Sequence, residues 1–299
     1  MKQLSILLFF CVLAAVAGAQ NQFLLYSFKG NVSVVENNVE SKAKAGKPLA
    51  NTATVKVASG GTATLICNEA AMFTLTKAGT YQLSGFGDSC KVHNSSVSAN
   101  YLKYVWAQMT KSGGSPGSNR KAYMNTVGAV SRGEINNVWV DSRLDTVNYA
   151  GGDFPLSWKS YAEAKEFDFF LYKSNNIVEP FYSTTVSKLK ISIPSFIARM
   201  KPGESYYWIA AIKGEENEDR KVLHYVTKDA FNAVLSMIKS QASGVEAPAE
   251  EAYRIAFMLE DAHYLSEAYQ YYSKAATLDP SNALYRSTVM SFRKDYEIK

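Results

Sequence analysis

The hydrophobic pattern of this chain changes its period along the sequence, and that change limits the available folds more than any other feature. Apolar and polar residues alternate over 23–92 and again over 122–226, which is the period of half-buried β-strands. From Thr227 onward, apolar residues recur every three or four positions, as in helices packed on one side. We therefore expect a multidomain protein of the β plus α class, with two all-β domains followed by a helical tail at 227–299.

The first β segment, 23–92, predicts a small barrel or sandwich built from short strands. Glycines at 46, 60, 61 and 79 mark turns between these strands. The expected strands are 28–35, 52–57, 62–67 and 72–76. A short helix is expected next, at 96–109, where apolar residues fall at helical spacing.

A stretch of Gly, Ser and Pro, KSGGSPGSNR at 111–120, follows this short helix. It carries too little apolar surface to order itself, so it is predicted to be a flexible linker. Residues 96–121, the helix and the linker together, therefore separate the two β domains.

The second β segment, 122–226, fits a two-sheet sandwich of about seven strands. Trp158 and Trp208 are expected in its core rather than in a ligand site. The expected strands are 129–131, 138–140, 154–158, 167–172, 190–193, 206–212 and 222–226. In the tail, helices are expected at 229–239, 248–259, 265–278 and 282–296, with Pro248 and Pro280 at helix starts or turns.

The first nineteen residues have the layout of a cleavable secretory signal. Lys2 precedes an apolar run at 4–17, and Ala17-Gly18-Ala19 forms a small-x-small cleavage site. The run is shorter than the roughly 20 residues that a membrane-spanning helix needs. We expect cleavage near Ala19 and a mature chain that is periplasmic, secreted or attached to the cell envelope. The alternative is an uncleaved N-terminal anchor, which would be the chain's direct link to a membrane.

The cysteines and the net charge limit the compartment and the class of partner that we expect. Removing the signal removes Cys11 and leaves Cys67 and Cys90, a pair that predicts a disulfide in an oxidising compartment, two buried free thiols being the alternative. The net charge of +5 is scattered without a basic stripe, which argues against nucleic-acid binding.

The tail resembles a tetratricopeptide repeat over about 247–280. The matching residues are Ala252, Ile255, Ala256 and Leu259 in the first helix and Ala268, Tyr272, Ala275 and Pro280 in the second helix and closing turn. The resemblance implies a helical hairpin with a cap helix at 282–296, and a partner-binding groove lined by the first helix. The groove residues that it implies are Glu250, Tyr253, Arg254, Phe257 and Glu260. The alternative is that these residues cover the sandwich domain, because a single repeat needs a neighbouring surface.

The two β segments also resemble known families. FKGNVSVVEN at 28–37, AGKPL at 45–49, TVKVASGGTATL at 54–65 and FTLTKAGTYQL at 73–83 are similar to the FecR-type domain of extracytoplasmic bacterial proteins. The family usually has an acidic residue where this chain has Lys47, and its anti-sigma role is not expected here because the chain shows no cytoplasmic region. FPLSW at 154–158, FDFFLY at 167–172 and MKPGESYYWIAAI at 200–212 are similar to fibronectin type III and related immunoglobulin-like modules.

Together these modules resemble cell-envelope proteins of Gram-negative bacteria, including those of the Bacteroidota. Asp145-Thr146-Val147 resembles the O-glycosylation acceptor found in that group, which implies modification at Thr146.

No catalytic, cofactor or metal site is predicted. The G-x-S-x-G match at 113–117 lies in the polar linker and not between a strand and a helix. His93, His224 and His263 are isolated from one another in the sequence, so no metal site is predicted at them. The acidic run at 215–219 lacks the Gly and the distal Glu of a calcium loop, so we expect a solvated hairpin tip.

We therefore expect a non-enzymatic adaptor or scaffold that binds other envelope proteins, whose identity the sequence does not specify. The alternative is a ligand-binding sensor that recognises glycan or peptidoglycan through exposed aromatic side chains.

Overall fold

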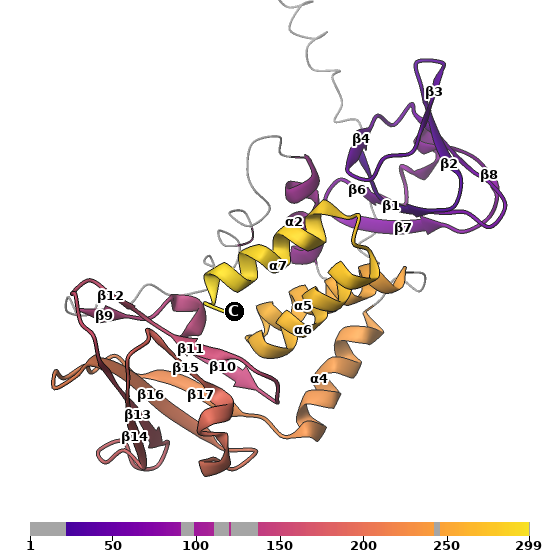
Figure 1. Ribbon diagram of the computed structural model, residues 1–299. Coiled ribbons are helices and arrows are strands. Elements are labelled where there is room, and N and C mark those ends of the chain that lie inside the picture. Colours follow the sequence, from indigo (N-terminus) through magenta and orange to yellow (C-terminus); the bar gives the residue numbers. More distant parts are fainter. Residues whose placement is uncertain (1–21, 91–98, 111–119, 121–136, 242–245, 299) are drawn as a thin grey trace, which may run out of the picture. The chain divides into compact units, whose positions relative to one another are not determined.

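The computed structural model describes residues 22–90, 99–110, 120, 137–241 and 246–298 (Figure 1). The chain forms two compact units, Met1–Ser112 with Ser243–Val245 and Gly113–Ala242 with Glu246–Lys299. The predicted β plus α class is confirmed, because mostly antiparallel sheets precede four tail helices. The predicted signal at 1–19 and the linker residues 111–119 lie outside the described residues. No described helix is both long and apolar enough to cross a membrane.

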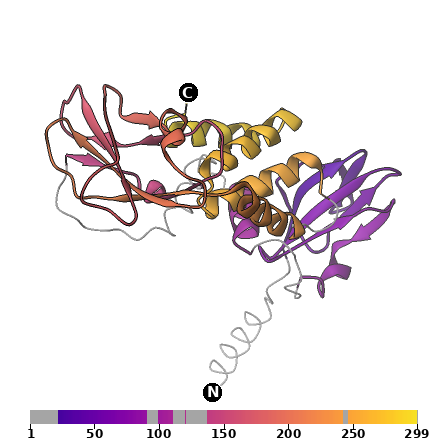
Figure 2. The same ribbon diagram turned by 90° about the horizontal axis from the view of Figure 1, so that it is seen from below.

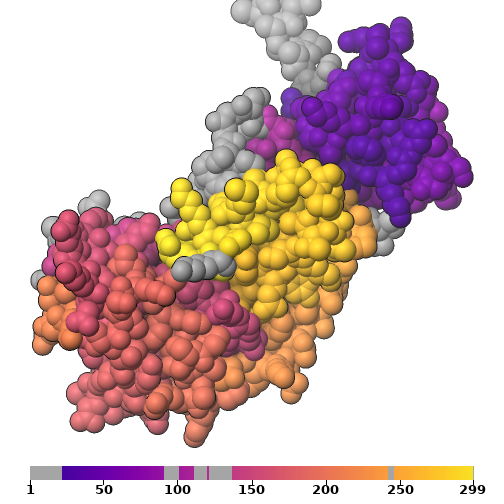
Figure 3. Space-filling model, in the orientation of Figure 1, coloured from indigo at the N-terminus to yellow at the C-terminus, as the bar shows by residue number. Residues whose placement is uncertain are grey.

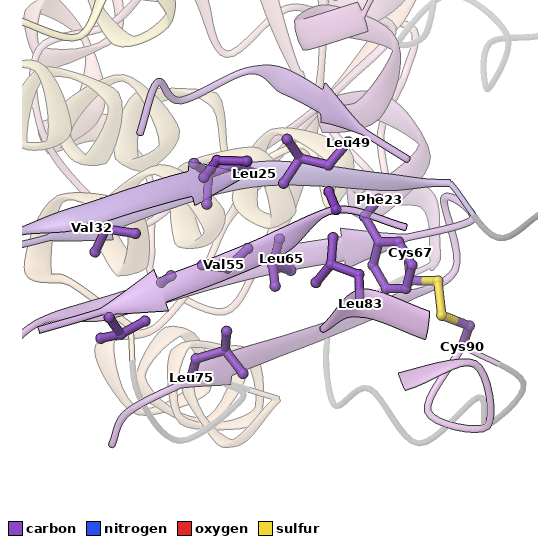
Figure 4. Packing of buried hydrophobic residues seen from close by; sticks show 14 residues of the cluster. Phe23, Leu25, Val32, Leu49, Val55, Leu65, Cys67, Leu75, Leu83 and Cys90 are labelled. Carbon is purple, nitrogen blue, oxygen red and sulfur yellow. A yellow bond between two sulfur atoms is a disulfide. The ribbon is translucent and has the colours of Figure 1, made fainter. Parts of the chain in front are cut away.

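The first unit contains two four-stranded antiparallel sheets, in the orders β4-β1-β6-β7 and β3-β2-β5-β8. Their strands are β1 (Phe23–Lys29), β2 (Val32–Glu36), β3 (Val39–Lys42), β4 (Lys47–Leu49), β5 (Thr54–Val57), β6 (Thr62–Cys67), β7 (Ala71–Leu75) and β8 (Gly79–Gln82). Alternating apolar residues from both sheets meet in one core, which Figure 4 shows around Leu25, Val55 and Leu65. A short 3-10 helix, η1 (Leu83–Phe86), follows β8.

The strand predicted at 28–35 is wrong, because the chain turns at Gly30 and divides it between β1 and β2. Gly30 has a φ of 73°, which side-chain-bearing residues rarely adopt, and β2 then joins the other sheet. The next turn, Asn37-Asn38, has positive φ at both positions, which suits the tight hairpin between β2 and β3.

Helix α2 (Ala99–Thr110) covers the outer face of the sheet β4-β1-β6-β7 and lies within the predicted range 96–109 apart from its last residue. It contacts β4 and β7, the two edge strands of that sheet. A β-bulge in β1 places Tyr26 outside the regular register, and its hydroxyl hydrogen bonds that of Tyr101 at 2.7 Å.

The second unit begins with a five-stranded sheet in the order β10-β17-β16-β13-β14 and two ladders, β11–β15 and β9–β12. The pair β10–β17 is parallel and the others are antiparallel. The strands are β9 (Val138–Trp139), β10 (Thr146–Tyr149), β11 (Pro155–Ser157), β12 (Lys159–Ser160), β13 (Phe167–Lys173), β14 (Tyr182–Val186), β15 (Lys190–Ser192), β16 (Ser205–Ile212) and β17 (Lys221–Tyr225). Strands β10, β12 and β14 were not predicted, and the expected strand at 129–131 lies outside the described residues.

Trp158 and Trp208 lie in the core of this sheet region, as predicted. The rings of both tryptophans stack on Phe169, with centroids 6.4 and 6.0 Å apart respectively. Trp158 follows β11 and Phe169 lies on β13. The β11–β15 ladder therefore packs against one face of the five-stranded sheet.

The tail consists of α4 (Lys228–Ser240), α5 (Pro248–Asp261), α6 (Leu265–Leu278) and α7 (Ala283–Asp295), close to the predicted ranges. Thr227 caps α4 and Asn282 caps α7 through their side-chain oxygens. Helices α5 and α6 form a hairpin, with α4 on one side and α7 on the other (Figure 2). In the space-filling view the atoms of the tail lie directly against those of the sheet region in the same unit (Figure 3).

Candidate functional site

The five residues that the repeat resemblance assigns to a partner groove are all buried. None is more than 7 % exposed, and the set is Glu250, Tyr253, Arg254, Phe257 and Glu260. They therefore do not form an open face in this conformation, and their assignment to a partner groove stays a prediction. Their side chains contact other parts of the same chain instead.

Two of these residues hold the tail helices together. The guanidinium of Arg254 donates to both carboxylate oxygens of Glu246, at 2.7 and 2.9 Å, and to the backbone oxygen of Ile238 at 2.8 Å. It therefore ties the end of α4 to α5. Tyr253 hydrogen bonds Thr288 of α7 at 3.0 Å.

Glu260 lies at the centre of a buried ionic cluster. One carboxylate oxygen is paired with Arg120 and accepts from the hydroxyl of Tyr296, and the other accepts from Tyr272 at 2.9 Å. Arg120 also pairs with Asp295 and lies 5.1 Å from the centre of the Phe292 ring. Burial alone would lower the pKa of Arg120, but Glu260 and the other acidic groups around it outweigh burial and raise the pKa, so the guanidinium stays charged.

Arg120 is the last residue of the predicted linker stretch and the one residue of that stretch that the structure describes. Its side chain is fully buried, although the neighbouring linker residues lie outside the described part of the chain. A hydrogen bond over 140 positions of sequence joins it to Glu260. No local spacing could have revealed this pair.

Arg143 extends the cluster toward the sheet region. Its guanidinium binds Asp141 through two hydrogen bonds of 2.8 and 2.7 Å, approaches Asp295 at 3.3 Å and covers the ring of Tyr296. Burial and the nearby Glu260 raise the pKa of Tyr296, so its hydroxyl stays neutral and can donate. Each arginine of the cluster thus faces two carboxylates, which suits a structural role in joining the tail to the sheet region.

The other sequence-predicted sites have clear positions. Cys67 and Cys90 form a disulfide, with Cα atoms 5.5 Å apart (Figure 4). Thr146 lies half-buried on β10, paired with Val222 of β17, and the preceding Asp145 is paired with Lys221 at 2.7 Å.

One Ser–His pair was not predicted. The Ser205 hydroxyl and Nδ1 of His224 lie 2.6 Å apart on neighbouring strands. In the described residues no carboxylate hydrogen bonds this imidazole, so the orienting acid of a catalytic triad is not present there.

The G-x-S-x-G match at 113–117 and His93 lie outside the described residues, and the described residues contain no His, Cys, Asp and Glu group that could hold a metal.

A partly exposed aromatic pair was also missed. The rings of Trp139 and Tyr161 stack with centroids 6.3 Å apart, Tyr161 is 75 % exposed, and the Lys159 ammonium lies 5.0 Å from the Trp139 ring. The strand pairing of β9 with β12 produces this arrangement, which the sequence signals only as scattered aromatic residues.

Comparison with known proteins adds no further assignment. No protein-family model matches this chain, and no curated protein matches it.

Proposed function

We propose that this protein is a non-enzymatic extracytoplasmic adaptor that binds other proteins of the bacterial cell envelope. In this proposal the first unit is a FecR-like domain, the sheet region of the second unit is a fibronectin type III or immunoglobulin-like sandwich, and α5 with α6 is one tetratricopeptide-type repeat capped by α7. Envelope proteins are the partners, and no cofactor is required.

The observation that carries the proposal is the packing of α5 on α6. The alanines that the repeat pattern places at the helix crossing are all buried, which allows the close approach of two helices: Ala252, Ala256, Ala268 and Ala275. Helical hairpins of this kind commonly present side chains to protein partners.

The disulfide supports the location outside the cytoplasm. A bond between Cys67 and Cys90 persists in an oxidising compartment, in agreement with the predicted signal at 1–19. We propose the periplasm, the cell surface or the medium as the site of action.

Since the predicted groove residues are buried, docking requires another surface of the tail. Large apolar side chains remain exposed on three tail helices: Met237 on α4 by 57 %, Leu278 on α6 by 48 % and Met290 on α7 by 71 %. Exposed apolar side chains contribute most when a partner removes them from water.

The test is in-cell cross-linking of the tagged full-length protein, followed by mass spectrometry. We expect one or two envelope proteins to be enriched, and the enrichment to be lost when Met237, Leu278 and Met290 are all replaced by Glu. A variant with Lys294→Glu, also exposed on α7, is the matched control. Deleting the tail would be a poorer test because Glu260 and Asp295 hold buried arginines. Recovery of the monomer alone from wild type would contradict the proposal.

The Trp139–Tyr161 pair, in which Tyr161 is exposed, favours a second candidate function, a sensor of glycan or peptidoglycan. Sugar rings present apolar C–H faces that pack on aromatic rings, and Lys159 supplies a neighbouring polar donor. Binding of soluble peptidoglycan fragments that Tyr161→Ala abolishes, and that Tyr182→Ala leaves unchanged, would favour the sensor over the adaptor.

A further inference from the structure

The helical hairpin is fastened to one edge of the five-stranded sheet. The backbone N–H of Asn148 on β10 donates to the oxygen of His263 at 2.9 Å, and its side-chain amide donates to the oxygen of Ala262 at 2.9 Å. The turn between α5 and α6 therefore covers part of this sheet edge at Asn148.

The start of α6 holds the loop that follows β10. One carboxylate oxygen of Glu267 accepts from the N–H groups of Ala150 and Gly151, at 2.8 and 2.9 Å. The neighbouring hydroxyl of Ser266 donates to the oxygen of Gly151 at 2.6 Å. These three bonds link a single helical turn to two consecutive residues of the loop.

The carboxyl group of Glu267 is poorly solvated. The residue is only 5 % exposed, and its second oxygen, Oε2, is buried without a hydrogen-bond partner among the described residues. No cation among the described residues pairs with the Glu267 carboxylate to offset its charge. Tyr149 of β10 and Tyr264 before α6 interact electrostatically with Glu267. The other titratable groups near this junction are Tyr225 and His224 of β17, Asp153 of the loop, Asp261 at the end of α5 and His263 of the following turn.

We propose that Glu267 is a protonation-controlled latch, which holds the α5–α6 hairpin on β10 and its following loop when neutral and weakens that junction when ionised. A neutral carboxyl can still accept both loop N–H groups through Oε1, and it removes the uncompensated charge from a buried site. The latch acts on the coupling between tail and sheet, because its hydrogen-bond donors belong to the loop that follows β10.

The direction of the pH effect follows from the difference in the pKa of Glu267 between the closed and the opened junction. Burial raises the pKa of Glu267 from 4.5 to about 7 in the closed junction, although the loop N–H groups oppose the rise. An opened junction exposes the carboxyl to water and restores its ordinary pKa, so opening releases a proton. The opening equilibrium constant should therefore rise about ten-fold per pH unit between roughly 5 and 6.5, and level off above about 7.5.

The test is amide hydrogen exchange of the full chain from pH 5 to 8, with each rate divided by its intrinsic rate. We expect the protection of the Ala150 and Gly151 amides to fall about ten-fold per pH unit in the lower half of this range, and to be independent of pH in Glu267→Gln. Ser266→Ala should reduce protection at every pH and keep the slope. Glu251→Gln, a charge removed from the first turn of α5, is the matched control and should behave as wild type.

A second measurement covers the case in which Glu267→Gln fails to fold. The side-chain carboxyl carbon of Glu267 in the wild-type protein should titrate near pH 7 by NMR. A midpoint near 4.5, or the same pH slope in Glu267→Gln as in wild type, would overturn the proposal.

Discussion

At the scale of single residues, buried charge is the feature that most distinguishes the tail. Arg120 and Glu260 are buried together, and each depends on the other because an unpaired ion in such a site is costly. The tyrosine hydroxyls of Tyr272 and Tyr296 then satisfy the remaining oxygen positions of Glu260. Removing one charge should therefore be far more damaging than removing an exposed one.

We expect Glu260→Gln to lower the free energy of unfolding of the second unit by about 3 kcal/mol. The amide has a single oxygen and can accept from only one of the two tyrosines. The loss therefore reports the charge that Arg120 no longer faces together with one tyrosine hydrogen bond, and it is limited because Asp295 still pairs with Arg120. Urea unfolding followed by tryptophan fluorescence would measure the change. Glu166→Gln, which breaks the exposed pair with Lys213, should leave the midpoint unchanged. Equal effects of the two variants would contradict the assignment of Glu260 as a buried partner.

Gly152 gives a second residue-scale test, at the loop that α6 holds. Its φ of 93° is strained for any side chain, and an added Cβ would lie 2.5 Å from Oγ of Ser266 and overlap Gln270. Gly152→Ala should therefore cost about 1–3 kcal/mol of stability. Gly151→Ala is the control, because nothing lies within 4 Å of an added Cβ there. Thermal unfolding of both variants would measure the difference, and equal midpoints would exclude close packing at Gly152.

At the scale of elements, the sequence predicted helices better than strands. The tail helices could be placed within a few residues because helical periodicity and caps such as Thr227 are local signals. Strand β14 was missed because Tyr182–Val186 is a polar edge strand without a buried apolar alternation. The sites depend even more on distant parts of the chain. Arg120 meets Glu260, and Glu267 meets Ala150, only after the sheet and the tail have packed.

The cap of α7 provides an element-scale prediction. The side-chain oxygen of Asn282 accepts from the N–H groups of Leu284 and Tyr285, at 3.0 and 3.4 Å. Asn282→Ala leaves the first turn without these bonds and should destabilise the second unit by about 1 kcal/mol. Asn282→Asp keeps an acceptor and should retain the wild-type urea midpoint. If the two variants lost equal stability, the cap would not be the cause.

At the scale of the whole molecule, the two units are expected to respond differently to reduction. Cys67 and Cys90, the two cysteines outside the predicted signal, lie in the first unit and belong to its hydrophobic core. The disulfide closes a loop with a sequence separation of 23 that contains β7, β8 and η1. It therefore restricts the unfolded chain of the first unit and does not cross-link the second.

We expect two calorimetric transitions, of which only one shifts when the disulfide is removed. In the variant carrying Cys67→Ala and Cys90→Ala, the first unit should lose about 3 kcal/mol of stability, while the transition of the second unit stays in place. Reduction of the wild-type protein should reproduce this shift, and reductant should have no effect on the double variant. Since each unit has its own core, the double variant shows whether the disulfide stabilises the first unit alone or the whole chain. A parallel shift of both transitions would instead mean that the units unfold as one cooperative structure.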